Sequence, residues 1–255
     1  ELDLVRSLER EERMRCVVGL QENVCTGGAD GYGRMTGKPA ATLLHLGPGL
    51  ANGLANLHNA KRGDVAIVNI VGDHATYHLQ YDTPLTSDVT AVAKPMSHWV
   101  HSAQSSEQLP QDAAHAIAAA LQPPGQVATL ILPADVSWED CAAGPARMPE
   151  LPAPRRVRED AIELCAAALA GGEPAMILLG GHVTDQDLEL AARIGAACGA
   201  RVALETFPTR LPWGAGRATC PSRRRREGRS WRRRASPCSR PACGKACSSR
   251  RCSSP

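Results

Sequence analysis

Short apolar runs alternate with stretches of helical periodicity through the first half of the chain. The runs are residues 16–20, 41–46, 65–71 and 127–132. Continuous apolar character of this kind is typical of strands buried in a parallel sheet. Helices are predicted at residues 22–35, after the loop at 47–49 as far as about 61, and at 107–121. Strands that alternate with helices predict an α/β fold with a doubly wound parallel sheet.

Two further segments flank this pattern. The leucines and the valine among residues 2–8 have the spacing of an amphipathic helix. Residues 72–88 are polar, aromatic and rich in turn formers, which predicts a long surface loop. Because long loops without regular structure are uncommon unless they have a function, we expect this one to carry functional residues.

A proline-rich segment divides the chain into parts. Residues 142–154 have the composition of an inter-domain linker, so residues 1–141 are predicted to form one domain. Residues 155–211 repeat the α/β pattern and predict part of a second, Rossmann-like domain. Its elements are a helix at 158–170, a strand at 175–179, a helix at 185–198 and a strand at 201–204. Residues 212–255 lack apolar periodicity, which predicts a disordered tail rich in Arg, Ser and Cys.

Charge separates this tail from the rest of the chain. Residues 214–255 hold 13 of the 29 Lys and Arg residues but only Glu227 among the 26 acidic residues. The remaining 16 basic and 25 acidic residues give residues 1–213 a net charge of −9. The Arg clusters would contact phosphates without sequence specificity, so no specific nucleic-acid partner is predicted. The abrupt change in composition suggests an out-of-frame reading that begins near residues 212–218.

The remaining composition limits location and metal binding. Five cysteines outside the tail lack the spacing of a metal site and are expected to be small buried residues. They are Cys16, Cys25, Cys141, Cys165 and Cys198. We find no signal peptide and no apolar run of membrane-spanning length, which favours a cytoplasmic location without a membrane partner. The chain begins at Glu1 rather than at Met, so we expect its N-terminus to be incomplete.

Two features lie where predicted strands end. Glu22 follows the apolar run at residues 16–20, and Gly47-Pro48-Gly49 follows the run at 41–46. Ligands of doubly wound sheets bind at the carboxyl ends of the strands, so both features are expected to border one site. Gly27 and Gly28 inside a predicted helix would be costly unless a backbone or a ligand approaches closely there.

Four blocks of residues in a fixed order resemble a known family. They are Glu22, Ala29-Asp30-Gly31-Tyr32-Gly33-Arg34-Met35-Thr36-Gly37, Gly47-Pro48-Gly49-Leu50-Ala51-Asn52-Gly53 and Leu130-Ile131-Leu132-Pro133-Ala134-Asp135-Val136. Residues 15–140 thereby resemble the pyrimidine-binding domain of the thiamine-diphosphate enzymes of the acetolactate synthase, benzoylformate decarboxylase and pyruvate decarboxylase superfamily. The segment after Gly72 is closest to the acetolactate synthase branch. Residues 155–211 resemble, more weakly, the start of the family's middle domain.

The resemblance implies a cofactor site. The cofactor-binding residues would be Glu22, Gly47, Pro48, Gly49 and Asn52. Glu22 would hydrogen-bond the pyrimidine N1′ and favour the imino tautomer, which takes the proton from the thiazolium C2. Such a hydrogen bond requires a carboxylate in a dry apolar pocket, which residues 17–20 are expected to provide. The alternative for Glu22 is a first-turn acid favoured by the helix dipole.

The resemblance also implies substrate-side residues. His45 occupies the place of a histidine that assists proton transfers in benzoylformate decarboxylase, so His45 is a catalytic candidate. A strand-end histidine with a structural role is the alternative. The candidates in the long loop are His74, Tyr77, His78 and Gln80.

Two other classes of function stay open. Gly47, Gly49 and Gly53, with Asp73 as a ribose-binding acid, imitate a dinucleotide fingerprint and would suggest an NAD(P)-dependent oxidoreductase. The glycine spacing is one residue too long, however, and Pro48 removes a backbone donor. A non-catalytic interaction fragment is the other alternative.

Intact family members need more than these residues. They decarboxylate 2-oxo acids, and many ligate the product to a second carbonyl compound. A diphosphate-binding domain with a Gly-Asp-Gly motif holds magnesium against the thiamine diphosphate, and this chain has no such motif in that context. The resemblance therefore implies no metal ligands here, a homodimer or homotetramer for the intact enzyme, and an inactive fragment that does not bind the cofactor tightly.

Overall fold

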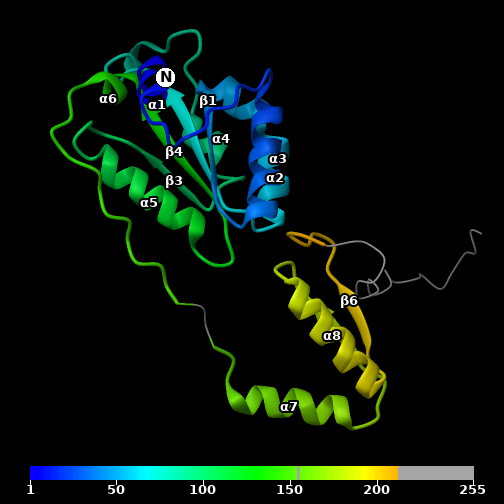
Figure 1. Cartoon of the computed structure of the whole chain (residues 1–255). Helices are drawn as coiled ribbons and strands as arrows, with labels where there is room; N and C mark the ends of the chain where they lie inside the picture. The colour runs from blue at the N-terminus through cyan, green and yellow to red at the C-terminus, as the bar shows by residue number, and fades with distance from the viewer. Residues whose placement is uncertain (154–155, 212–255) are drawn as a thin grey trace, which may run out of the picture. The chain divides into compact units, whose positions relative to one another are not determined.

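Four parallel strands form the central sheet of residues 1–141 in the computed structural model, which describes residues 1–153 and 156–211 (Figure 1). The strands are β1 (Ala40–His45), β2 (Ile67–Asp73), β3 (Trp99–Ser102) and β4 (Val127–Pro133). Their order is β1-β2-β4-β3, and each neighbouring pair is parallel. The predicted α/β fold with a parallel sheet is confirmed.

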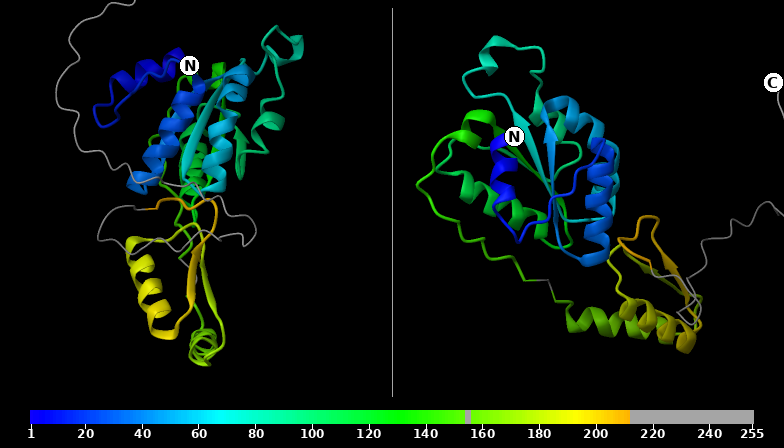
Figure 2. Two further views of the ribbon diagram at one scale, coloured as in Figure 1. Left: turned by 90° about the vertical axis from the view of Figure 1, so that its right-hand side faces the viewer. Right: turned by 45° about the horizontal axis from the view of Figure 1, so that its top comes forward.

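Helices cover both faces of this sheet (Figures 1 and 2). They are α1 (Leu2–Glu9), α2 (Glu22–Thr36), α3 (Leu46–Arg62), α4 (Val89–Ala93), α5 (Leu109–Leu121) and α6 (Ala134–Trp138). Side chains of a strand alternate between faces, so the sheet supports two cores. One core joins Leu44 and Ile131 to α2, α3 and α4. The other joins Leu130 to α5, to α6 and to Leu4 of α1.

A row of buried polar side chains crosses the sheet beneath α3. Thr42 donates to Oδ1 of Asn69 at 2.7 Å, and Nδ2 of Asn69 donates to Oγ1 of Thr129 at 3.2 Å. The hydroxyls of Thr129 and Ser97 lie 2.7 Å apart. Thr42, Asn69 and Thr129 are register partners in β1, β2 and β4. A slip of one residue would turn these groups to the other face and leave them unpaired, so the row specifies the register of the strands.

Small residues bring α2 and α3 close together. Thr26 of α2 is fully buried and donates to the backbone oxygen of Gly53 in α3 at 3.1 Å. A Cβ atom on Gly53 would lie 2.9 Å from Cγ2 of Thr26. A Cβ atom on Gly33 would lie 2.5 Å from Cγ1 of Val65. The contact at Gly53 leaves no room for a side chain and sets the distance between α2 and α3, the two helices that carry the predicted cofactor residues. The contact at Gly33 packs α2 against Val65, which follows α3.

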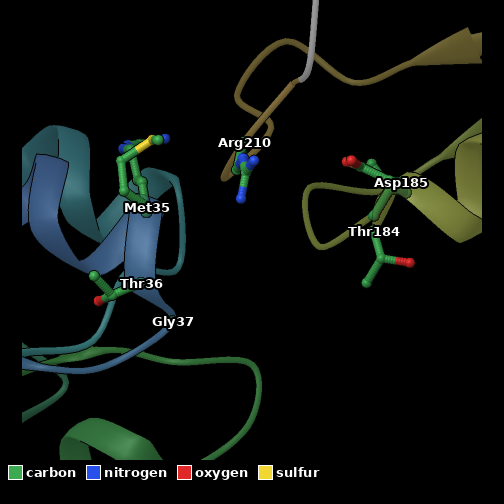
Figure 3. A pocket seen from close by; sticks show the side chains of 8 residues that line it. Met35, Thr36, Gly37, Thr184, Asp185 and Arg210 are labelled. Carbon is green, nitrogen blue, oxygen red and sulfur yellow. The ribbon is translucent and has the colours of Figure 1, made fainter. Parts of the chain in front are cut away.

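The other glycines of α2 have mixed roles. A Cβ atom on Gly27 would lie 2.8 Å from Nδ2 of Asn56, so the expected close approach is present at Gly27. Gly28 has no atom within 4 Å of that position, so packing among the described residues gives no reason for a glycine there. Gly37, with φ of 69°, ends α2 in the left-handed conformation that favours glycine (Figure 3).

Residues 16–20 do not form the predicted strand. They are an irregular segment in which the exposed fractions of Val17, Val18 and Leu20 are 77%, 89% and 98%. β1 is an edge strand, and within the described ranges nothing pairs along its outer side. A run of apolar residues predicts burial, but a strand also needs a hydrogen-bonded neighbour and a covering layer, which this segment lacks.

The expectation of buried cysteines is also wrong. Cys16, Cys141 and Cys165 are exposed, Cys25 and Cys198 are partly exposed, and all five are free thiols. Cys16 lies in the irregular segment, and Cys165 lies on α7 (Glu159–Ala170), which has no buried residue. Size and polarity favour burial of cysteine, but the local packing decides it.

The segment between β2 and α4 is the predicted long loop. It extends past the end of the sheet and contains one short 3-10 helix, η1 (Leu79–Tyr81) (Figure 2). The short elements α4 and β3 were not predicted from the sequence. Four or five residues show too little periodicity to distinguish them from a loop.

Residues 156–211, the smaller unit, contain a second sheet of two strands. The unit contains α7, β5 (Met176–Leu179), α8 (Asp185–Cys198) and β6 (Arg201–Leu204), and its two strands are parallel. Thr184 begins α8 with a capping box, because its hydroxyl accepts from the N–H of Asp187 while Asp187 accepts from the N–H of Thr184. The predicted disordered tail at 212–255 lies outside the described residues. Among the helices that the structure describes, none is long and apolar enough to cross a membrane.

Candidate functional site

The strands β1, β2 and β4 end side by side and border the candidate site. His45, the last residue of β1, pairs with Gly72 of β2, and Asp73 pairs with Pro133 of β4. The helices α3 and α6 begin directly after β1 and β4. This is the edge of a parallel sheet at which ligands bind.

Three of the predicted cofactor residues lie together. Glu22 is in the first turn of α2, and Gln21 caps this helix by accepting from the N–H of Asn23 at 2.8 Å. Nδ2 of Asn52 donates to Oε2 of Glu22 at 3.1 Å. A Cβ atom on Gly49 would lie 3.5 Å from Oε1 of Glu22. The packing of α2 against α3 therefore brings together the carboxylate of Glu22, the side-chain amide of Asn52 and the backbone of Gly49, which no side chain covers.

The predicted loop at residues 47–49 is the first turn of α3. Leu46 begins this helix with φ of 54°, a left-handed conformation that costs a non-glycine residue about 1–3 kcal/mol. Pro48 is tolerated because the first N–H groups of a helix have no intrahelical acceptor. A Cβ atom on Gly47 would lie 2.5 Å from Cβ of Ser87, so the turn packs against the end of the long loop. Strained, tightly packed backbone at the end of a strand is characteristic of functional sites.

The surroundings of Glu22 differ from the expected dry pocket. Glu22 is partly exposed, and Asn52 beside it is exposed. The apolar residues that were expected to cover Glu22, at positions 17, 18 and 20, point into solvent instead. The reason is the missing strand at 16–20, because a pocket is dry only where a packed layer excludes water.

A cavity of about 360 Å³ opens beside His45. Its titratable lining residues are Glu1, His45, Asp73, His74 and His78. Its apolar lining includes Leu46, Leu85 and Trp138. A polar group of acids and histidines with an apolar wall can bind a small organic acid and exchange protons with it.

The structure brings together three of the predicted substrate-side residues and leaves two outside. His45, His74 and His78 all line the cavity. Nε2 of His74 lies 3.2 Å from Oγ1 of Thr83, which holds the ring within the long loop. Tyr77 and Gln80 do not line the cavity. Tyr77 is 53% exposed with its ring edge against His78, and Gln80 donates to the backbone oxygen of Tyr77.

Sequence reasoning missed two acids of this cavity. Asp73 was considered only as a ribose-binding acid, although its place at the end of β2 was a sufficient signal for a site residue. Burial raises the pKa of Asp73 and outweighs the hydrogen bond that it accepts from the N–H of His74. Glu1 carried no signal, since it reaches the cavity only through the placement of α1.

Asp135 ties the long loop to the end of β4. It is buried and accepts hydrogen bonds from both the N–H and the hydroxyl of Thr76. Burial by itself would raise the pKa of Asp135, but the hydrogen bonds from Thr76 outweigh it and the pKa is lowered. The family block that contains Asp135 therefore holds the loop that carries His74 and His78.

The contacts of the glycines disfavour a dinucleotide site. The space that a side chain would take on Gly47 is occupied by Ser87, and the space on Gly53 is occupied by Thr26. A phosphate cradle needs glycines whose backbone is open to the ligand. At Gly47 and Gly53 the space beside the backbone is instead filled by side chains of the protein itself.

The described residues suit one half of a thiamine diphosphate molecule. Glu22, Asn52 and the bare backbone at Gly49 offer a carboxylate acceptor and close approach for a flat heterocycle. Residues 1–153 and 156–211 contain no group of three or more His, Cys, Asp or Glu residues that could hold a metal ion.

Comparisons with known proteins agree with this geometry. Residues 1–105 match the thiamine pyrophosphate enzyme, N-terminal TPP binding domain family. The chain is 52% identical over 217 residues to a Mycobacterium tuberculosis (strain ATCC 25618 / H37Rv) protein assigned as the acetolactate synthase large subunit IlvX, covering 85% of this chain and 41% of that protein. It is 29% identical over 134 residues to the benzoylformate decarboxylase of Pseudomonas aeruginosa, covering 52% of this chain and 25% of the relative.

Solved structures show the same similarity. A Mycobacterium smegmatis protein assigned as a thiamin diphosphate-dependent enzyme superposes with a TM-score of 0.67 at 29% identity, over 77% of this chain and 38% of the other. The Rhodococcus jostii RHA1 4-hydroxybenzoylformate decarboxylase has the same fold, with a TM-score of 0.62 at 24% identity over the same shares. The chain thus spans less than half the length of these relatives, and the family resemblance of its sequence is confirmed. Residues 1–105 thus carry the N-terminal TPP binding domain of the thiamine pyrophosphate enzymes, and the chain is similar to part of an acetolactate synthase large subunit.

Proposed function

We propose that residues 1–141 form the pyrimidine half of a thiamine diphosphate site in an acetolactate-synthase-like enzyme. The intact enzyme would decarboxylate a 2-oxo acid or ligate the product to a second carbonyl compound. The observation that carries this proposal is the cluster of Glu22, Asn52 and Gly49, which the packing of α2 on α3 assembles. Residues 155–211 would begin the middle domain, after a linker at 142–154.

Each residue of the cluster has a separate task in this proposal. When bound, the cofactor supplies a carbon nucleophile for the carbonyl group of the substrate. Glu22 hydrogen-bonds the pyrimidine N1′ through Oε1, the oxygen beside Gly49. Asn52 donates to Oε2 and thereby holds the carboxylate in one orientation. Gly49 leaves space for the ring, and with Gly47 and Pro48 it presents backbone at the start of α3.

The cavity beside His45 would hold the 2-oxo acid. His45 adjoins the cofactor cluster, because a Cβ atom on Gly49 would lie 3.4 Å from Cβ of His45 and 3.5 Å from Oε1 of Glu22. His45 would therefore be placed to give or take a proton beside the cofactor cluster. His74 and His78 lie on the loop side of the same cavity and would contact the substrate carboxylate.

The chain by itself is proposed to be inactive. The match covers 41% of the Mycobacterium tuberculosis relative, and the described residues contain no group of three or more His, Cys, Asp or Glu residues that could hold a metal ion. In the intact enzyme we expect a homodimer or homotetramer in the cytoplasm, in which another domain holds magnesium and the diphosphate. The tail contributes nothing to this proposal.

Titration of the ¹⁵N-labelled 255-residue chain with thiamine, followed by NMR, tests the pyrimidine half directly. We expect weak binding, with a Kd on the order of 1 mM, because one half of the contacts of the cofactor is present. The amide signals of Gly49 and the side-chain amide of Asn52 should shift. Glu22→Gln should abolish these shifts, whereas Glu12→Gln, an exposed acid in the turn before the site, should leave them unchanged.

Three outcomes would contradict the proposal. Shifts that persist in Glu22→Gln would show that thiamine binds elsewhere. Micromolar binding of thiamine diphosphate with magnesium in calorimetry would contradict the incomplete site and the inactive chain. Fluorescence enhancement of NADH on mixing would favour the oxidoreductase alternative, while no binding at all together with copurification of a partner would favour the interaction fragment.

A further inference from the structure

The carboxylate of Glu1 lies against His45 at the end of the sheet. Its two oxygens are 2.9 Å and 2.7 Å from Nδ1 of His45. Glu1 is the N-cap residue of α1, yet its side chain makes no capping hydrogen bond to that helix. The carboxylate is thus directed to the imidazole instead of its own helix N-terminus, where an acid would ordinarily be stabilised.

Gly72 provides the space that Glu1 occupies. His45 and Gly72 are register partners at the ends of β1 and β2. A Cβ atom on Gly72 would collide with the Glu1 side chain, lying 2.5 Å from its Cγ. Gly72 is not among the described glycines with positive φ, so its backbone would accept an L-residue. Room for Glu1, rather than backbone conformation, therefore explains the glycine at this position.

Packing of α1 holds Glu1 at this place. Leu4, one helical turn after Glu1, packs into the core that contains Val136 of α6. Figure 1 shows α1 next to α6 at the end of the sheet toward which the strand arrows point. The placement of Glu1 thus has a hydrophobic anchor that is independent of its contact with His45.

We propose that Glu1 is a positioning residue that holds the imidazole of His45 for proton transfer, in a slot that Gly72 keeps open. An acceptor at Nδ1 selects the neutral tautomer with the proton on Nδ1 and leaves the Nε2 lone pair free. A proton taken from a substrate hydroxyl at Nε2 gives an imidazolium that the carboxylate stabilises, and the same nitrogen returns that proton. Within the described ranges, Nε2 of His45 has no hydrogen-bond partner. This role of Glu1 rests on the proposed function of His45.

The tautomer of His45 tests the proposal. Long-range ¹H–¹⁵N spectra of the labelled chain near pH 8, above the ordinary histidine pKa of about 6.5, report which ring nitrogen carries the proton. The His45 signals are those that disappear in His45→Gln. We expect the proton on Nδ1 in the parent chain and in Glu1→Gln, whose side-chain oxygen still accepts. We expect a change to the Nε2–H tautomer, which free imidazole side chains prefer, in Glu1→Leu.

Gly72→Ala is an independent variant in which both Glu1 and His45 keep their side chains. Its methyl group should displace the carboxylate and produce the same change of tautomer as Glu1→Leu. Two controls should keep the parent tautomer: Asp3→Asn, an acid of α1 that pairs with Arg6, and Asp73→Asn, an acid of the same cavity. The side-chain amide signal of the buried Asn69 reports that each variant is folded.

Two results would overturn the proposal: an Nε2–H tautomer in the parent chain, or an unchanged tautomer in a folded Glu1→Leu variant. If Gly72→Ala does not fold, the Glu1 variants decide the question. The spectra are recorded without thiamine diphosphate, so they are independent of cofactor binding. A chain that binds thiamine but shows the wrong tautomer contradicts the role of Glu1 alone. A chain with the expected tautomer that does not bind thiamine contradicts the proposed function.

Discussion

The sheet of residues 1–141 and the strand pair of residues 156–211 arise from the same sequence pattern but differ in burial. All residues of β4 are buried, whereas those of β5 alternate between exposed and partly exposed. β4 has a strand on each side and helices on both faces, while within the described residues β5 pairs with β6 alone. Periodicity therefore specifies the elements in both units, but burial depends on how many neighbours each element has.

Removal of one leucine side chain from each unit tests the difference in burial most directly. Leu44 is 1% exposed, and Leu178 is 65% exposed. Leu44→Ala should lower the free energy of unfolding by about 2–5 kcal/mol, because it leaves a cavity in a packed core. Leu178→Ala should change it by less than about 0.5 kcal/mol. Urea unfolding, with hydrogen exchange of the amides of β2 and β5, measures both effects.

Equal losses of stability in the two variants would contradict the difference in burial between the two units. In particular, a large loss for Leu178→Ala would mean that β5 is covered in solution by chain outside the described residues or by a second molecule. Sedimentation of the parent chain would then separate these two explanations.

A second test concerns the polar row, which has no counterpart in the smaller unit. Asn69→Ala removes the acceptor for Thr42 and a donor to Thr129, both of which are buried. Thr129 keeps Ser97 as a partner, but Thr42 loses its acceptor, and a buried group left without a partner costs about 1–3 kcal/mol, so the variant should be clearly less stable. Thermal unfolding followed by circular dichroism measures the loss. A variant as stable as the parent would show that the row does not specify the register.

The smallest expected difference concerns pH. The pKa of Asp135 is lowered because hydrogen bonds from Thr76 outweigh burial, and the pKa of Asp187 is lowered chiefly by the hydrogen bond from the N–H of Thr184. A carboxyl whose folded pKa lies below its unfolded value of about 3.9 stabilises the fold above that value. This stabilisation is lost as the pH falls below that value toward the folded pKa.

Substitution of each acid by Asn should therefore flatten the acid limb of the stability curve. Asp135→Asn should expose the long loop to faster hydrogen exchange as well, since Asp135 holds Thr76. Asp187→Asn should affect the start of α8 alone. Unfolding free energies from about pH 3 to 7 provide the measurement, and parallel curves for parent and variants would refute the linkage.

The parts of the fold that could be predicted are those that local sequence determines. The helix at 185–198 and the strand at 201–204 have the predicted bounds, because Thr184 and Gly199 mark the ends of that helix. The strand at 16–20 was predicted on the same grounds and is absent, because a strand exists only with a neighbour. β3 was missed because four partly buried residues give no clear pattern.

Some residues of the candidate site could likewise be predicted from the sequence, and others could not. Motifs marked Glu22, Gly49 and Asn52, the resemblance to benzoylformate decarboxylase marked His45, and the long loop marked His74. No local signal marked Glu1, because its contact with His45 joins residues 44 positions apart. Tyr77 and Gln80 had the right chemistry and the right loop, but the loop turns them away from the cavity.

The sequence by itself determined the α/β class, the helices α2, α3 and α8, and the resemblance to the thiamine pyrophosphate enzymes. These follow from periodicity, capping residues and motifs, which act over a few residues along the chain. Tertiary structure alone decided that residues 16–20 stay exposed and that Asn52 holds Glu22. It alone also decided that the space at Gly72 lets the carboxylate of Glu1 reach the imidazole of His45. Each of these depends on which surfaces pack together, and packing joins residues that are far apart in the sequence.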